Sequence, residues 1–282
     1  MATIGNLWGG NMSDVSRFRE AFQLRLRDLD KERDIAFADR YAEGYANRLP
    51  GLATDLVSGN VNVIVASATP AARAARDATR GKDIAVVFAA VGEPSLVAAT
   101  NVTGVRLLEP ESSRERLNIL REVIPNLKTV AALWNEANPV HTTYLEQMGG
   151  VKDFKVQDPN DLDRALDAIR QQRPEALVVL PDLMFHSQRS RIITFAATNR
   201  LPAIYSQRSY VEEGGLMSYG PSYTEMFRQA ANLVSKILNG TAPSQLPIQD
   251  VRSPERVINL NAAAQIGVRI SKEALAGATV IN

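Results

Sequence analysis

The sequence has no cysteine and two histidines, His141 and His186, among its 282 residues. The lack of cysteine excludes disulfides and thiolate metal sites. No His-x-x-x-His pair occurs, and neither histidine has a carboxylate at ligand spacing, so metal binding has little support. We expect both histidines to be surface or helix-capping residues. No Gly-x-Gly-x-x-Gly or Walker loop follows the first strand-like segment, and we predict no cofactor.

Neither sign of charge is in clear excess, because the chain has 32 basic and 31 acidic residues. A surface dedicated to nucleic acid needs a basic excess, so we expect no nucleic-acid partner. No apolar run approaches the roughly 20 residues that cross a bilayer. Met1 to Thr3 lead directly into a strand-like segment without a basic or apolar leader, and we expect any secretory signal to have been removed. We therefore predict a periplasmic or lipid-anchored extracytoplasmic protein.

Hydrophobic residues make up 45% and charged residues 22% of the chain, which is typical of a soluble globular protein. Strand-like and helix-like segments alternate throughout, and this pattern favours parallel sheets with right-handed crossovers. We predict a first helix from Val15 to Leu29 with Asp14 at its cap, and a helix over 186–200. The expected strands end at or near Trp8, Asp39, Ala66, Phe88, Leu108, Trp134, Gln157, Leu180, Tyr205 and Ser218.

Ten strands are many for one twisted sheet, so we predict two lobes. The fold class is α/β, with two doubly wound parallel-sheet lobes joined by a hinge. The N-terminal lobe covers 1–108 and is completed by about 220–256. The C-terminal lobe covers 109–219 and is completed by about 257–282.

Ligands of open α/β sheets bind beyond the carboxyl ends of the strands. The residues at these ends provide aromatic rings, hydroxyls, amides, one carboxylate and flexible backbone at glycines. This combination suits a small polar ligand with an aromatic or apolar part. Tyr205-Ser206-Gln207 is one such end. We predict no catalytic residue and no metal ligand, and we predict ligand contacts from Trp8, Gly9, Ser67, Ala68, Thr69, Gly92, Glu93, Trp134, Asn135, Asp182, Tyr205, Ser218 and Tyr219.

Three of these predictions have a structural alternative. The turn from Ser67 to Pro70 places a helix N-terminus at a strand end, where it can hold a carboxylate or phosphate. Its alternative is simple helix capping by Ser67 or Thr69. Asp182 can hold an ammonium group or cap the next helix. Trp8 and Trp134 can cover a ligand face or pack in the hinge.

Short motifs in a fixed order resemble the substrate-binding proteins of ABC importers, in the group of tryptophan- and tyrosine-type components. The resemblance runs nearly end to end. It is carried by Arg48-Leu49-Pro50-Gly51-Leu52-Ala53, Thr69-Pro70-Ala71-Ala72, Asn101-Val102-Thr103-Gly104-Val105, Leu133-Trp134-Asn135, Ala137-Asn138-Pro139, the stretch from Tyr210 to Gly220, and Val257-Ile258-Asn259-Leu260-Asn261.

The resemblance implies a type I periplasmic-binding fold that closes around an amino acid and then meets the membrane subunits of a transporter. It implies that the Ser67–Pro70 turn holds the ligand carboxylate and that Asp182 holds the amine. Glu93 occupies a position where the family usually has Asp. The segment between Pro94 and Asn101 is shorter than in the family and lacks its Gly-rich stretch, so we expect a reshaped loop there. We expect a monomer.

Two other functions fit the same pattern. One is the ligand-sensing domain of a transcriptional regulator, which would carry a DNA-binding headpiece before residue 4. The other is an α/β enzyme that acts in the cleft between the lobes, such as a racemase or hydrolase. Nothing in the sequence indicates catalysis, and we expect that the protein is not an enzyme.

Overall fold

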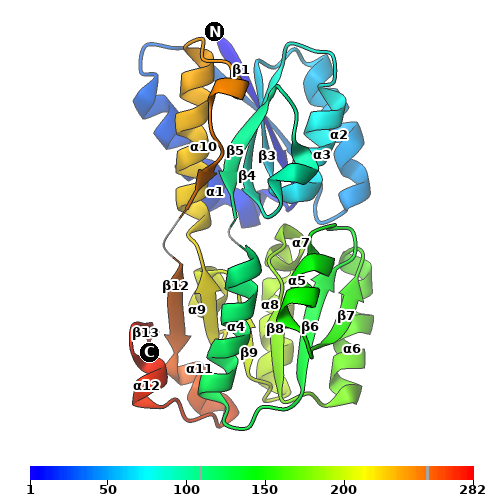
Figure 1. Cartoon of the computed structure of the whole chain (residues 1–282), viewed down its shortest axis with the longest axis vertical. Coiled ribbons are helices and arrows are strands. Elements are labelled where there is room, and N and C mark those ends of the chain that lie inside the picture. The colour runs from blue at the N-terminus through cyan, green and yellow to red at the C-terminus, as the bar shows by residue number, and fades with distance from the viewer. Residues whose placement is uncertain (108, 252–253) are drawn as a thin grey trace. The chain divides into compact units, whose positions relative to one another are not determined.

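The computed structural model describes residues 1–107, 109–251 and 254–282, without the side chains of residues 96 and 109–111. The chain divides into two compact units (Figure 1). Unit 1 comprises Met1–Leu107 and Tyr223–Val251, and unit 2 comprises Leu108–Ser222 and Arg252–Asn282. The chain therefore passes between the units three times. Leu108, at which the sequence places the end of the first lobe, lies outside the described residues.

Unit 1 is built on a parallel sheet of six strands in the order β11-β5-β4-β3-β1-β2 within its described residues. Its strands are β1 (Ala2–Trp8), β2 (Ile35–Tyr41), β3 (Val63–Ser67), β4 (Ala85–Val91), β5 (Val102–Arg106) and β11 (Gln249–Asp250). Its helices are α1 (Met12–Leu29), η1 (Ala46–Arg48), α2 (Leu49–Ser58), α3 (Ala68–Ala78), η2 (Pro94–Val97), α10 (Tyr223–Leu238) and η4 (Pro243–Gln245).

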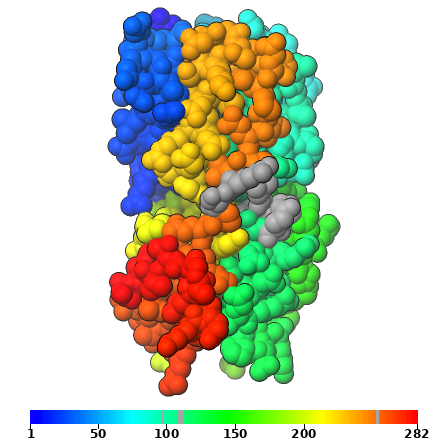
Figure 2. Space-filling view, turned by 60° about the vertical axis from the view of Figure 1, so that its left-hand side comes forward, coloured from blue at the N-terminus to red at the C-terminus, as the bar shows by residue number. Residues whose placement is uncertain are grey.

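Helices cover both faces of this sheet, as the doubly wound prediction requires. The apolar residues of α2 and α3 form one hydrophobic cluster with Leu7, Ile64 and Phe88. On the other face, Phe18 of α1 stacks on Phe227 of α10 with ring centroids 5.7 Å apart. Figure 2 shows the yellow segment that contains α10 beside the blue segment that contains α1. The core of unit 1 is therefore continuous through the sheet.

Unit 2 has a seven-stranded sheet in the order β13-β12-β10-β9-β8-β6-β7. Its strands are β6 (Val130–Asn135), β7 (Lys152–Val156), β8 (Ala176–Val179), β9 (Ala203–Tyr205), β10 (Met217–Gly220), β12 (Glu255–Asn259) and β13 (Thr279–Ile281). Its helices are α4 (Glu109–Val123), α5 (His141–Met148), η3 (Pro159–Asp161), α6 (Leu162–Gln172), α7 (Leu183–Ser187), α8 (Arg189–Thr198), α9 (Arg208–Glu212), α11 (Leu260–Ile266) and α12 (Lys272–Leu275).

The predicted class of two mainly parallel α/β sheets is confirmed, with one departure. Strand β12 runs antiparallel to β10 and pairs Val257 with Ser218. Helices α6 and α8 pack on one face of the sheet around Leu166, Phe185 and Ile192. Helices α4 and α5 contact the strands outside that cluster. Unit 2 is thus also covered on both faces.

Three sequence predictions are corrected by local contacts. Asn11, and not Asp14, caps α1, because its Oδ1 accepts a hydrogen bond from the Asp14 backbone N–H. The helix predicted over 186–200 is two helices, α7 and α8. Both histidines are buried in unit 2 and are not surface residues, with His141 0% and His186 3% exposed.

Two glycines of the Tyr210–Gly220 motif are required by close backbone approaches. A Cβ at Gly220 would lie 2.3 Å from the carbonyl oxygen of Ser206. A Cβ at Gly215 would lie 2.7 Å from both the Tyr205 ring and the Tyr210 carbonyl. No side chain fits at these distances, so the motif keeps β9 and β10 in tight register.

Candidate ligand site

Both sheets share a topology that defines where a ligand edge forms. In unit 1 the strands follow the order β2-β1-β3-β4-β5, and in unit 2 the corresponding order is β7-β6-β8-β9-β10. Each order reverses once, between β1 and β3 or between β6 and β8. In open α/β sheets this reversal leaves a crevice beyond the carboxyl ends of the two strands. We therefore expect the ligand contacts of each unit at the ends of these two strands.

Ser67 joins the two strand ends at the reversal point of unit 1. Its Oγ donates a hydrogen bond to the Leu7 carbonyl at 3.1 Å and accepts one from the Gly9 N–H at 3.0 Å. The hydroxyl is therefore used to hold β1 against β3. It makes no capping hydrogen bond to α3, whose N-terminus begins at Ala68. Simple capping by Ser67, the alternative weighed from the sequence, does not occur.

The turn after β3 has an unusual backbone. Ala68 has φ of +62°, and Ala90 at the end of the neighbouring strand β4 has φ of +61°. A β-bulge accompanies Ala90, since the β4–β5 register shifts between Ala89 and Val91. Non-glycine residues adopt this conformation at a cost of about 1–3 kcal/mol, and such residues cluster at ligand sites. Thr69 is buried in the first turn of α3.

The other predicted residues of unit 1 are divided between this edge and the core. Gly92 and Glu93 follow β4, and Glu93 caps η2 by accepting from the Ser95 N–H at 3.3 Å. Trp8 packs its ring on Phe227 with centroids 5.0 Å apart, and its indole N–H donates to Asp39 at 3.1 Å. The structure gives Trp8 a packing position, and a ligand contact by this ring stays a prediction.

His141 joins the two strand ends at the reversal point of unit 2. Its Nδ1 accepts a hydrogen bond from the Asn135 N–H at 2.9 Å, at the end of β6. Its Nε2 lies 3.1 Å from the Pro181 carbonyl, which follows β8. One tautomer satisfies both contacts, namely neutral imidazole with the proton on Nε2. The role of His141 in unit 2 thus matches that of Ser67 in unit 1.

The surroundings of His141 favour this neutral form. Burial lowers the pKa of His141 below its ordinary value, and the nearby Arg116 cation acts in the same direction. The Asp182 carboxylate opposes them. Because the ring is fully buried, we take the desolvation penalty on the charged form to dominate.

Asp182 lies beside this histidine and is 9% exposed. One carboxylate oxygen caps α7 by accepting from the Met184 N–H at 2.8 Å. The other accepts from the Asn138 amide at 3.0 Å. A carboxylate offers about four lone-pair positions, so these two bonds leave capacity for a ligand donor. The helix-cap role weighed from the sequence is therefore present, and it is compatible with ligand binding.

The remaining predicted residues of unit 2 lie on neighbouring strands. Asn135 ends β6, and its Oδ1 accepts from the Ala137 N–H at 2.9 Å. Trp134 donates its indole N–H to Asp153 of β7 at 3.1 Å. Ser218 pairs with Tyr205 across β10 and β9. The Tyr219 carbonyl accepts from Arg116 at 2.9 Å, while burial and then the nearby Glu115 carboxylate raise the pKa of the Tyr219 phenol.

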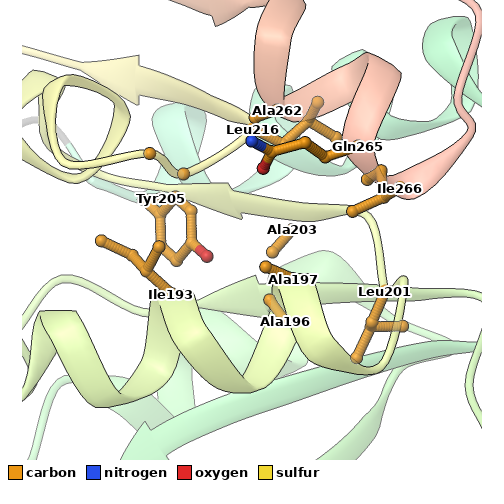
Figure 3. Close-up of a pocket in the computed structure, with 12 residues that line it drawn as sticks. Ile193, Ala196, Ala197, Leu201, Ala203, Tyr205, Leu216, Ala262, Gln265 and Ile266 are labelled. Atoms are coloured by element: carbon orange, nitrogen blue, oxygen red, sulfur yellow. The ribbon is translucent and has the colours of Figure 1, made fainter.

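Tyr205 is the last residue of β9, and its side chain packs in the core of unit 2, so a ligand contact by Tyr205 stays a prediction. Its ring stacks on Tyr210 with centroids 4.5 Å apart, and burial raises the pKa of its hydroxyl. Figure 3 shows the ring beside Ile193 in a pocket that also includes Ala203, at the start of β9. This pocket has a volume of about 10 Å³, which is room for about one water molecule. We therefore do not treat it as the ligand site.

Sequence reasoning missed three residues at the edge of unit 2. They are His141, Asn138 and Gln207, which the structure buries with 0%, 3% and 5% exposure. Asn138 belonged to a family motif and Gln207 to a predicted strand end, but neither was predicted to bind the ligand. No group of three or more potential metal-ligating side chains occurs in the described part of the chain.

Within the same described ranges, no helix combines the length and apolarity needed to span a bilayer. The comparisons with known proteins begin with a family model. Residues 14–281 match the model described as "ABC transporter substrate binding protein". A protein named tyrosine-binding protein from Clostridioides difficile strain R20291 is 24% identical over 224 residues, which are 74% of this chain and 64% of that protein. The match thus spans less than two thirds of this relative.

Two solved structures are similar over nearly their whole length. A conserved domain protein from Vibrio cholerae O1 biovar El Tor is 27% identical with a TM-score of 0.89, covering 100% of this chain and 99% of that one. A Streptococcus pneumoniae ABC domain in complex with L-Trp is 23% identical with a TM-score of 0.88, covering 99% of each chain. The latter likeness supports the fold.

Proposed function

The chain belongs to the family of ABC transporter substrate-binding proteins, and on that premise we propose that it binds one small amino acid, preferably aromatic, for delivery to the membrane subunits of an importer. It does so as an extracytoplasmic monomer, without catalysis and without a nucleic-acid partner. The closure of two lobes around the ligand stays a prediction from the family resemblance.

The observation that carries the amino-acid assignment is Asp182. It is a buried carboxylate at the reversal point of a parallel sheet, and it retains acceptor capacity after two short hydrogen bonds. A buried carboxylate is stable when a cation or several donors compensate it, and an ammonium group supplies both. The relative named for tyrosine and the neighbour that holds L-Trp support an aromatic side chain on that amino acid.

Unit 1 offers the complementary charge preference. The N-terminus of α3 has backbone N–H groups and a positive helix-dipole end, and Ser67 does not cap it. We propose that Ser67, Ala68 and Thr69 form the carboxylate seat named by the resemblance, with Ser67 acting mainly by holding the turn. Gly9, Gly92 and Glu93 are kept as proposed neighbours of that seat.

A thermal-shift screen tests the proposal. The twenty amino acids, common sugars, purines and aromatic acids are added one at a time to the purified protein, and positive results are confirmed by isothermal titration calorimetry. We expect L-tryptophan or L-tyrosine to raise the melting temperature. If sugars or purines alone raise it, the amino-acid assignment is wrong.

A variant separates the site from the fold. Asp182→Asn keeps the shape and one acceptor oxygen but removes the charge, so we expect affinity for the amino acid to fall by about tenfold or more. Asp167→Asn, on the exposed surface of α6 in the same unit, is the matched control. Equal binding by wild type and Asp182→Asn would remove Asp182 from the ligand site.

A further inference from the structure

Several buried polar atoms of unit 2 lack hydrogen-bond partners among the described residues, and two of them belong to side chains just beyond the ends of strands. They are Asn138 Oδ1, an acceptor, and Gln207 Nε2, a donor. Their side chains are 3% and 5% exposed. An unsatisfied buried polar group costs about 1–3 kcal/mol, so its retention calls for an explanation. Binding of a ligand that supplies both missing partners is such an explanation.

The sheet register places these residues in one row. Leu133 pairs with Val179 and Val178 pairs with Ile204, so Asn135 at the end of β6, Pro181 two residues past β8 and Gln207 two residues past β9 occupy equivalent positions at this edge. Neighbouring strands lie about 4.8 Å apart. Asp182 follows Pro181, and Asn138 already contacts Asp182 at 3.0 Å. Asn138 therefore contacts Asp182 directly, and Gln207 lies at the same carboxyl edge one strand away.

The identity of the orphaned Asn138 atom follows from its neighbours. The Asn138 amide nitrogen lies 3.0 Å from Asp182 Oδ2 and 3.3 Å from His141 Nε2. The Asp182 oxygen requires a donor, which fixes the nitrogen on that side. His141 Nε2 donates its proton to the Pro181 carbonyl. In this orientation of the amide, His141 therefore donates no hydrogen bond to Asn138 Oδ1. The carbonyl oxygen of Asn138 is thus left as a free acceptor.

The ligand that fits must present donors next to an acceptor. An ammonium group has three N–H donors, of which Asp182 takes one and Asn138 Oδ1 a second. An adjacent carboxylate accepts from Gln207 Nε2. A neutral amide at position 207 is suited to this role because a carboxylate there would repel both Asp182 and the ligand carboxylate.

We propose that Asn138, Asp182 and Gln207 form a seat in unit 2 for the zwitterionic head group of an α-amino acid, with Asn138 binding the ammonium and Gln207 the carboxylate. This assignment rests on the proposed function and extends it, because it adds a side-chain donor for the ligand carboxylate in unit 2 to the carboxylate seat proposed for Ser67, Ala68 and Thr69 of unit 1. His141 positions the seat by holding Asn135 and Pro181.

Ligand analogues test each contact separately. The probes are L-tryptophan, tryptamine, which lacks the carboxylate, and indole-3-propionate, which lacks the ammonium. Titration calorimetry measures L-tryptophan, and competition against bound L-tryptophan measures the two weaker analogues. The variants are Asn138→Ala and Gln207→Ala, with Gln171→Ala on the exposed surface of α6 as the matched control.

Each variant has its own expected pattern. Asn138→Ala weakens L-tryptophan and tryptamine by about tenfold and leaves indole-3-propionate nearly unchanged. Gln207→Ala weakens L-tryptophan and indole-3-propionate by about as much and leaves tryptamine nearly unchanged. Two isosteric variants preserve the packing should alanine impair folding. Asn138→Asp increases the preference for tryptamine over indole-3-propionate, and so does Gln207→Glu, because each adds negative charge.

The contrary outcomes are distinct. Wild-type affinity of both alanine variants for all three probes overturns the head-group seat, while the proposed function stands if Asp182→Asn still loses binding. An equal loss for all three probes also overturns it, since that pattern indicates a structural effect. If wild type binds neither L-tryptophan nor L-tyrosine, the proposed aromatic amino-acid function itself fails, and this seat with it.

Discussion

Protonation of His141 is expected to destabilise unit 2, and the structure gives the sign and the limit of the effect. The neutral ring accepts from the Asn135 N–H and donates to the Pro181 carbonyl, and burial lowers its pKa below the ordinary 6.5. An added proton would place a second donor against the Asn135 N–H. Above about pH 6.5 the histidine is neutral in both the folded and the unfolded state, so its contribution to stability is complete. As the pH falls from 6.5 to the lower folded-state pKa, only the unfolded state binds the proton, and this contribution is lost.

The magnitude follows from linkage. Between its folded and unfolded pKa values, one histidine changes the free energy of unfolding by at most about 1.4 kcal/mol per pH unit. His141→Gln keeps a donor near the Pro181 carbonyl and leaves the Asn135 N–H unsatisfied, which costs about 1–3 kcal/mol at neutral pH. Because glutamine does not titrate, the stability gap between wild type and variant should shrink as pH falls from 6.5 toward 5.

Each unit contains one of the two tryptophans, so unfolding can be followed unit by unit. In a Trp8→Phe background, the fluorescence of Trp134 reports unit 2 alone. Urea unfolding at pH 7.5, 6.5, 5.8 and 5.2 gives the gap at each pH. A gap that stays constant across this range would refute the neutral, buried histidine, and so would a gap that widens on acidification.

Two further substitutions test the packing of each unit. Gly220→Ala brings a Cβ to 2.3 Å from the Ser206 carbonyl, so we expect unit 2 to lose about 1–3 kcal/mol by the Trp134 assay. Gly51→Ala in unit 1, where no atom lies within 4 Å of the new Cβ, is its control and is followed by the fluorescence of Trp8 in a Trp134→Phe background; an equal loss of stability in the two variants would contradict the close approach. Asp39→Ala removes the acceptor of three side-chain donors in unit 1 and should cost about 2–4 kcal/mol by the fluorescence of Trp8 in a Trp134→Phe background. Asp77→Ala, which breaks exposed ion pairs, should cost less than about 1 kcal/mol, and a similar loss in both variants would count against the buried network.

Local signals predicted the element types well because their causes are local. The helix predicted from Val15 to Leu29 begins three residues earlier, at Met12, and ends at Leu29 as predicted. The strand predicted to end at or near Ala66 ends at Ser67. The choice between Asn11 and Asp14 as the cap of α1 was harder, because both residue types cap well and lie three positions apart.

Long-range pairing was beyond these signals. Strand β12 is antiparallel to β10 and β13 is a short parallel edge strand, yet neither has a turn motif or periodicity that reveals its partner. The burial of His141 is a similar case. A histidine at a helix start is usually exposed, and its burial depends on Asn135 and Pro181, which come from two other elements.

Side-chain direction explains why the rings of the aromatic candidates pack in the cores, whereas the polar candidates lie beyond the ends of their strands. Residues within a strand point to one face or the other of the sheet, and both faces are covered by helices in this fold. Trp8 and Tyr205 are the last residues of β1 and β9, so their rings pack on Phe227 and Tyr210.

Residues one to three positions beyond a strand are free of that alternation and can turn toward the carboxyl edge. Asp182 and Gln207 hold such positions after β8 and β9. In a doubly wound sheet, a ligand contact is therefore better sought just past the end of the apolar run than on its last residue. By that criterion Gln207 outranks Tyr205 as a ligand residue, and comparing L-tryptophan affinity in Gln207→Ala and Tyr205→Phe tests the ranking. A larger loss of affinity in Tyr205→Phe, in a protein that remains folded by the Trp134 assay, would reverse it.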